Sequence, residues 1–118
     1  MNLEKLYQEM GGDMADAVRR LGSIAAVERF LRMFAGDDTF AMLEAAMSAG
    51  DDQRAFRAAH TLKGVAANLS FTKLRASASE LTELLRAPAD TIPPEAAPML
   101  EAVTRDYDAT VAAIRNLD

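Results

Sequence analysis

The chain has 118 residues, a hydrophobic content of 50% and no cysteine. These values suit one domain with a single packed core, and they exclude a disulfide framework and a thiolate metal site. The net charge of −5 at pH 7 disfavours nonspecific binding to nucleic acid, because the phosphate backbone would be repelled at long range. A single histidine also excludes a multi-histidine metal cluster.

The chain also lacks the usual sequence signals for a membrane or for secretion. No segment approaches 18 uninterrupted apolar residues, and the N-terminal MNLEKLYQEM carries acidic residues where a signal peptide needs a basic flank. We therefore expect a cytoplasmic protein that makes no contact with a membrane.

Almost every segment follows the helical period, and none alternates over the length of a strand. This pattern predicts an all-α protein. Two short helices are expected first. One ends at Gly11 and Gly12, and the other runs from a cap at Asp13 to Leu21, with Gly22 as its stop.

Residues 23 to 49 continue the helical spacing after a candidate N-cap at Ser23. The interruption GDDT begins at Gly36, so this segment is either two helices or one long helix kinked there. Its expected core stripe consists of Ile24, Val27, Leu31, Phe34, Phe40, Leu43 and Met47. Met33 and Met42 are most simply core filler as well.

Three further helices are expected in the rest of the chain. The first runs from Asp51 to Asn68, and after a turn at Leu69 and Ser70 the second runs over residues 71 to 86. The proline-rich segment 87 to 94 is the only clear linker, and the last helix covers residues 95 to 117. The second carries the stripe Phe71, Leu74, Ala78, Leu81 and Leu85, and the last carries Ala96, Met99, Val103, Tyr107, Thr110, Ile114 and Leu117.

Short connections between amphipathic helices favour antiparallel neighbours. The expected architecture is therefore an antiparallel four-helix bundle with a short N-terminal helical addition, and residues 1 to 118 form a single domain.

His60, the only histidine, lies in the helix predicted over residues 51 to 68. The buried stripe of that helix should consist of Ala55, Ala59, Leu62, Ala66 and Leu69. At about 100° per residue, His60 lies roughly 140° from the centre of this stripe, so the prediction is that it faces solvent. A lone histidine is more often a surface residue without a role or a hydrogen-bonded core residue, so its neighbours matter.

Gly64 follows His60 by one turn, although glycine in a helix costs roughly 1 kcal/mol relative to alanine. Side chains lean toward the helix N-terminus, so a residue at position 64 would cover the turn that holds His60. Gly64 and the small Ala67 would leave His60 open to a partner. Alternatively, Gly64 admits another element of this protein or is a tolerated weak spot.

Lys63 is a helical neighbour of His60, three residues away. An isolated lysine usually just solvates a face. Beside a histidine that carries a phosphoryl group, its ammonium would be useful, because opposite charges about 4 Å apart attract by roughly 1 kcal/mol at an exposed site. An exposed imidazole is mostly neutral at pH 7 and can act as a nucleophile.

The segment AAHTLKGVAANLS resembles the signature of histidine-containing phosphotransfer (HPt) domains, whose motif runs His-x-x-Lys-Gly within a helix. The preceding AGDDQRAFRA, the spacing to Leu74 and the GGD near residue 12 also resemble bacterial members. The resemblance implies a helical bundle that carries a phosphoryl group in a two-component phosphorelay. His60 would be the phosphorylated nucleophile and Lys63 the phosphoryl-stabilising cation. The expected docking surface consists of Gly64, Ala67, Arg57 and Asn68.

The resemblance also implies the partners, which are a response-regulator receiver domain, a hybrid histidine kinase, or both. Arg57 and Lys63 would meet carboxylates of the receiver. We expect a monomer that has no cofactor of its own, does not bind nucleic acid and has no independent catalytic site. Mg²⁺ is expected only in the partner receiver.

The chain departs from the family pattern at two places. Members commonly have glycine where this chain has Ser70, so the turn is expected to use Asn68 in a left-handed conformation or Ser70 as the next N-cap. Some members place a glutamine of the next helix near the histidine, but residues 71 to 86 contain none, and Gln53 is too far along the axis to replace it.

Two other functions remain open. The first is a bundle that binds a receiver or a kinase without being phosphorylated. The second is an enzyme that uses His60 as a general base, but the sequence offers no nucleophile, second acid or metal set for it.

Overall fold

The structure is a computed structural model that describes residues 1–87 and 89–117, and helices make up most of these stretches. The all-helical prediction is confirmed, and the described stretches contain seven helices and no strand. The helices are α1 Leu3–Met10, α2 Met14–Leu21, α3 Ile24–Ala35, α4 Thr39–Ala49, α5 Asp52–Asn68, α6 Thr72–Leu85 and α7 Ala96–Arg115.

Polar side chains define where four of these helices begin. Asp13 caps α2 by accepting a hydrogen bond from the backbone N–H of Asp16, and Ser23 caps α3 by accepting one from Ala26. Asp51 caps α5 through the N–H of Arg54, at 3.1 Å, and Asn2 caps α1. The caps predicted at Asp13 and Ser23 are confirmed, and Asp51 precedes its helix rather than forming its first turn.

Residues 23 to 49 form two helices rather than one kinked helix. Gly36 follows α3, and the side chain of Asp37 accepts a hydrogen bond at 2.7 Å from the N–H of Thr39, the first residue of α4. Asp37 thus lets the chain stop one helix and start the next.

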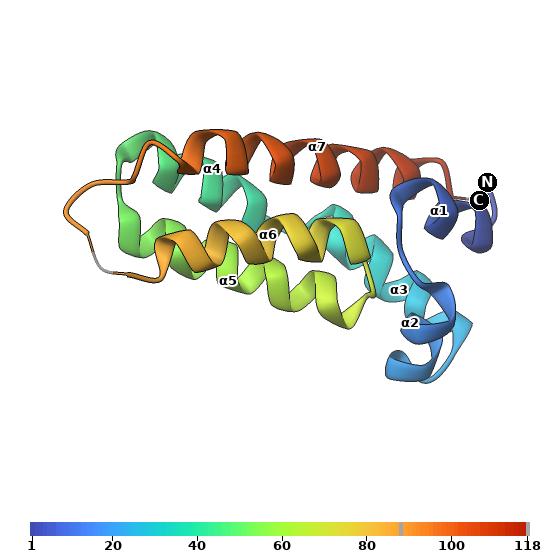
Figure 1. Cartoon of the computed structure of the whole chain (residues 1–118). Coiled ribbons are helices and arrows are strands. Elements are labelled where there is room, and N and C mark those ends of the chain that lie inside the picture. The colour runs from blue at the N-terminus through green and yellow to red at the C-terminus, as the bar shows by residue number, and fades with distance from the viewer. Residues whose placement is uncertain (88, 118) are drawn as a thin grey trace.

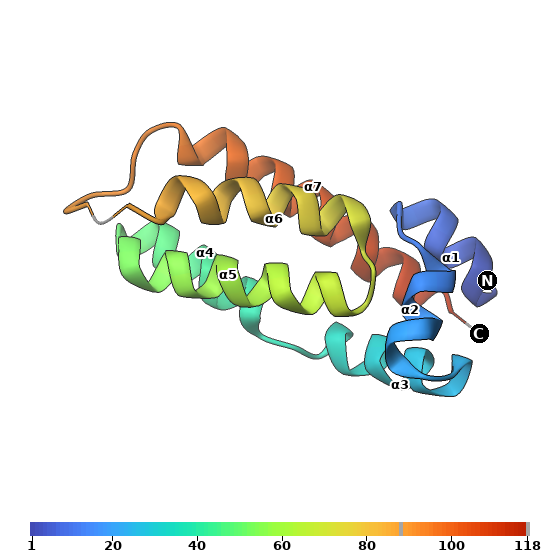
Figure 2. The same ribbon diagram turned by 60° about the horizontal axis from the view of Figure 1, so that its bottom comes forward.

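The four helices α4 to α7 lie side by side, and successive helices run in opposite directions (Figures 1 and 2). In chain order each packs against the next. The three N-terminal helices gather at one end of this group, where α1 and α3 pack against α7 and α2 packs against α3 (Figure 2). Among the described residues no helix is both long and apolar enough to cross a membrane.

An aromatic cluster joins the N-terminal helices to the others. The rings of Phe34 and Phe71 meet edge to face with centroids 5.2 Å apart, and Tyr7 lies 6.1 Å from Phe71. Phe40 stacks on Tyr107 at 4.1 Å, which ties α4 to α7. Such pairs add stability beyond the burial of their area.

Three apolar residues that were expected in the core are instead exposed, namely Ile24, Met33 and Met42. Met33 lies two residues after the buried Leu31, and Met42 lies two residues after the buried Phe40. Two residues correspond to about 200° around a helix, so both methionines point away from the core. Ile24 is the first residue of α3, where the expected stripe begins too early.

The turn between α5 and α6 differs from both expectations. Asn68 is the last residue of α5, and the N-cap position of α6 is Phe71, without a side-chain cap. Ser70 itself adopts the left-handed conformation, with φ 56°. This conformation costs a non-glycine residue about 1–2 kcal/mol, so other contacts must stabilise it.

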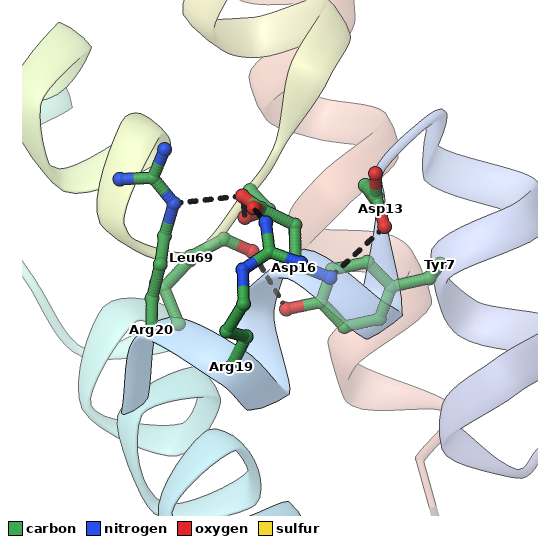
Figure 3. A network of polar contacts seen from close by, with 7 residues as sticks. Tyr7, Asp13, Asp16, Arg19, Arg20 and Leu69 are labelled. Carbon is green, nitrogen blue, oxygen red and sulfur yellow. Dashed lines mark hydrogen bonds and ion pairs between the residues drawn. The ribbon is translucent and has the colours of Figure 1, made fainter. Parts of the chain in front are cut away.

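These contacts come from α2 and its cap. Figure 3 shows Asp16 of α2 with Arg19 and Arg20, and Tyr7 with Leu69. The hydroxyl of Ser70 donates a hydrogen bond to the carboxylate of Asp16 at 2.5 Å, and its carbonyl accepts one from the N–H of Asp13 at 2.9 Å. Arg19 and Arg20 also bind Asp16. The buried Tyr7 hydroxyl donates to the carbonyl of Leu69 at 2.7 Å. The N-terminal helices therefore hold the end of the helix that carries His60.

Candidate functional site

Helix α5 places His60 on the side opposite its buried stripe. All five residues predicted for that stripe are buried, and His60 is exposed. The stripe consists mostly of alanine, so the helix backbone lies close to its neighbours while the imidazole projects outward. The prediction that His60 faces solvent is confirmed.

Gly64 lies inside α5 next to open space. A Cβ atom built at this position would meet no heavy atom within 4 Å, apart from the backbone of its own helix. The alternative that Gly64 admits another described element of this protein is therefore wrong. A side chain here would lie over the turn of His60, so glycine leaves that face of the imidazole accessible.

The other predicted site residues also lie on α5, but at different distances from His60. Lys63 and Ala67 are half-buried, and Arg57 and Asn68 are exposed. Asn68 follows His60 by eight residues, which is about 12 Å along a helix. The structure thus groups Arg57, Lys63, Gly64 and Ala67 within two turns of His60 and places Asn68 at the far end of the helix.

Three residues that the sequence interpretation did not single out form a chain of contacts from His60 to the end of α6. The ring of Phe56 lies one turn before His60 and stacks on it, with centroids 6.0 Å apart and planes 12° apart. The guanidinium of Arg86 lies over the same Phe56 ring, 5.4 Å from its centroid. Arg86 donates two hydrogen bonds to the carboxylate of Glu83, at 2.9 and 3.0 Å.

The Glu83–Arg86 ion pair interacts electrostatically with His60. The pKa of Glu83 lies below its ordinary value, first because Arg86 donates hydrogen bonds to it. The positive charges of Arg86, Lys63 and protonated His60 lower it further. Glu83 therefore lies within electrostatic reach of both His60 and Lys63.

Part of this arrangement was accessible from the sequence. Phe56 precedes His60 by four residues, the spacing at which helical side chains touch. In an antiparallel hairpin that turns near Ser70, position 60 lies opposite position 80, so Glu83 belongs to the same region. Residues 71 to 86 contain no glutamine, and the charged pair of Glu83 and Arg86 lies in this segment instead.

The exposed histidine, the lysine three residues later and the open glycine all lie in a segment that matches a known family. The family model of the Hpt domain matches residues 25–116. The chain belongs to the Hpt domain family. Hpt domains are phosphocarrier modules that carry out histidine phosphotransfer in phosphorelays, where they interact with receiver domains and histidine kinases. Comparison with curated proteins and with solved structures gave no match.

The matched region of this Hpt domain contains α4 to α7 and nearly all of α3, whereas α1 and α2 precede it. Ser70 and Leu69 lie inside the match, and their partners Tyr7, Asp13 and Asp16 lie outside it. The N-terminal helices are thus an addition that supports the turn at the end of α5.

A groove of about 520 Å³ runs between α4 and α5 of this Hpt domain, on the other side of α5 from Glu83 and Arg86. Its walls are formed in equal parts by apolar and by polar or charged side chains, namely Thr39, Met42, Ala45, Ala46, Ala49, Asp51, Arg54, Arg57, Ala58 and Thr61. Arg57 precedes His60 by three residues, and Thr61 follows it directly. The groove therefore opens beside the histidine, and the exposed Met42 forms part of it.

Proposed function

We propose that this protein is the phosphocarrier of a two-component phosphorelay and that His60 accepts and donates the phosphoryl group. The observation that carries this proposal is the exposed imidazole of His60 on the outer side of α5, within the region that matches the Hpt domain. The open space at Gly64 supports it, because a partner must bring a phosphorylated aspartate up to the ring.

In the proposed reaction, neutral His60 uses the lone pair of its unprotonated ring nitrogen to attack the phosphorus of a receiver's aspartyl phosphate in line. The N–P bond forms as the P–O bond to the aspartate breaks, and the aspartate leaves as a carboxylate. The proton on the second ring nitrogen stays in place, so the product ring is cationic and this step needs no base. Transfer to a receiver reverses these steps.

Lys63 is the proposed stabilising cation for the phosphoryl group. It is three residues from His60 and half-buried, so its stem has support from the protein surface. The protein needs no cofactor in this mechanism. The receiver's acidic pocket, with its Mg²⁺, supplies most of the electrostatic catalysis.

The proposed docking surface surrounds His60 and includes Gly64, Ala67, Arg57 and Asn68. The small residues permit close approach, and Arg57 lies exposed beside the groove between α4 and α5. Its positive charge complements the acidic rim of a receiver's active site. We propose a receiver domain, a hybrid histidine kinase, or both as the partner.

The remaining parts of the proposal concern the state of the molecule. Residues 1–118 form one domain, and α4 to α7 are its antiparallel four-helix bundle. The protein acts as a cytoplasmic monomer.

The proposal is tested by incubating the protein with phosphorylated receiver domains encoded in the same genome. Acid-labile phosphate should appear at position 60 of the wild-type protein and should be absent from His60→Gln. Undiminished labelling of His60→Gln would show that another residue is phosphorylated. A protein that binds receivers but takes up no phosphate would instead be a pure interaction module.

A further inference from the structure

We propose that Arg86 is a second cation for the phosphoryl group on His60. While His60 is unphosphorylated, Arg86 is instead bound to Glu83 in an ion pair. This inference rests on the proposed role of His60. It assigns Glu83 of α6 and Arg86, the residue that follows this helix, to a site whose other proposed residues all lie on α5.

The imidazole of His60 and the guanidinium of Arg86 both contact the ring of Phe56. The imidazole of His60 is stacked 6.0 Å from the Phe56 centroid, and the guanidinium of Arg86 lies 5.4 Å from the same centroid. Arginine favours aromatic faces because the ring quadrupole attracts its positive charge. Phe56 is thus a shared neighbour of Arg86 and His60, and the proposal requires a change of the Arg86 rotamer to bring its guanidinium to a phosphoryl group on His60.

Glu83 occupies the hydrogen-bonding edge of Arg86. Its two carboxylate oxygens accept from Nε and one terminal nitrogen of Arg86, a bidentate arrangement that phosphoryl oxygens can also form. A phosphoryl group on His60 carries nearly two negative charges, whereas Glu83 carries one. The phosphoryl group therefore competes for Arg86, and it repels Glu83, which lies within electrostatic reach of His60.

This exchange predicts opposite effects for the two residues. Loss of a phosphoryl group passes through a loose transition state in which the charge on the phosphoryl oxygens is spread and reduced. A cation on these oxygens stabilises the phosphohistidine more than its transition state, so Arg86 should slow hydrolysis. Glu83 should speed hydrolysis, because it binds Arg86 away from the phosphoryl group and adds negative charge near it.

The experiment uses phosphoramidate, which transfers its phosphoryl group to the ring nitrogen with release of ammonia. The half-life of acid-labile phosphate at position 60 is then measured at low salt for wild type, Arg86→Ala, Arg86→Lys and Glu83→Gln. Arg32→Ala and Glu28→Gln are matched controls. These residues form an exposed ion pair on α3, which packs against α2 and α7. Circular dichroism verifies that each variant folds.

We expect Arg86→Ala to shorten the half-life about two- to fivefold and Glu83→Gln to lengthen it by a similar factor. This range corresponds to the free energy that an exposed ion pair contributes. Arg86→Lys should restore part of the loss. In the double variant Arg86→Ala/Glu83→Gln, the substitution of Glu83 should change the half-life less than it does when Arg86 is present, because Glu83 acts partly through Arg86. High salt should reduce all these differences. A purely structural pair would give changes of the same sign without this salt dependence.

Two results would overturn the inference, and they differ. If wild type and all variants are labelled at position 60 with equal half-lives, Arg86 has no role and His60 remains a phosphocarrier. If wild type acquires no acid-labile phosphate at position 60, from phosphoramidate or from a receiver, the proposed function fails and the role of Arg86 fails with it.

Discussion

Substitutions of Gly64 test two properties separately, namely the stability of the isolated protein and the access of a partner to His60. Gly64 lies within α5 and is not among the glycines with a positive φ, and a Cβ atom there would meet nothing within 4 Å. Gly64→Ala should therefore gain the helix propensity of alanine, about 0.8–1.0 kcal/mol in the free energy of unfolding. For a chain of this size that gain raises Tm by roughly 3–6 °C.

A larger side chain at this position should have a different effect on function. In Gly64→Leu the side chain leans toward the helix N-terminus and covers the turn of His60, so a docking partner must move away or pack poorly. Overpacking of this kind costs an interface about 1–3 kcal/mol, so we expect phosphotransfer to slow by about tenfold or more. The protein itself should remain at least as stable as wild type.

The assay combines thermal unfolding with the rate of phosphotransfer from a receiver. Ala112→Leu is the control, since Ala112 is an exposed small residue on α7 and the change introduces the same leucine side chain away from α5. A lower Tm for Gly64→Ala would refute the argument that position 64 is open. A wild-type transfer rate for Gly64→Leu would refute the argument that glycine provides access to His60.

Three further predictions concern other residues. Tyr7→Phe removes a buried hydrogen bond to the carbonyl of Leu69 and should lower the free energy of unfolding by about 1–2 kcal/mol in a urea titration; an unchanged midpoint would contradict this. Lys63→Ala should slow phosphotransfer about fivefold while circular dichroism stays the same, and an unaltered rate would exclude its role as the phosphoryl cation. The pKa of Asp16 lies below its ordinary value of 3.8, first because Ser70 donates a hydrogen bond to it. A carboxyl group whose pKa is lowered by folding contributes stability that is complete above the unfolded pKa and is lost as the pH falls through the folded value. Thermal unfolding between about pH 5 and pH 2 should therefore show a larger loss of stability for wild type than for Asp16→Asn, and equal losses would contradict this.

Local signals in the sequence carried most of the correct predictions. The caps at Asp13 and Ser23 and the stop at Gly22 are encoded within a few residues, so they could be located without tertiary information. The outward direction of His60 followed from the regular alanine spacing of its helix. The residues predicted for the site therefore lie on α5, where the sequence placed them.

The incorrect or missing predictions depend on contacts between distant segments. Ser70 adopts a left-handed conformation because Asp13 and Asp16, more than 50 residues earlier, provide its hydrogen-bond partners. Met33 and Met42 were assigned to the core because they are apolar, but apolarity alone does not give the face of a helix. The hairpin spacing places Glu83 only in the region of His60, and the contact of Arg86 with Phe56 depends on side-chain orientations that no local pattern specifies.

Helix α1 begins at the same pole of the molecule at which α7 ends (Figures 1 and 2), and the two helices are in contact. A short peptide could therefore join the end of α7 to the start of α1, and the chain could be reopened between α6 and α7. The resulting circular permutant would start with α7 and finish with α6, so the α5–α6 hairpin would remain continuous. In such a rearranged chain, α1 and α2 would become an internal insertion that still reaches the α5–α6 turn.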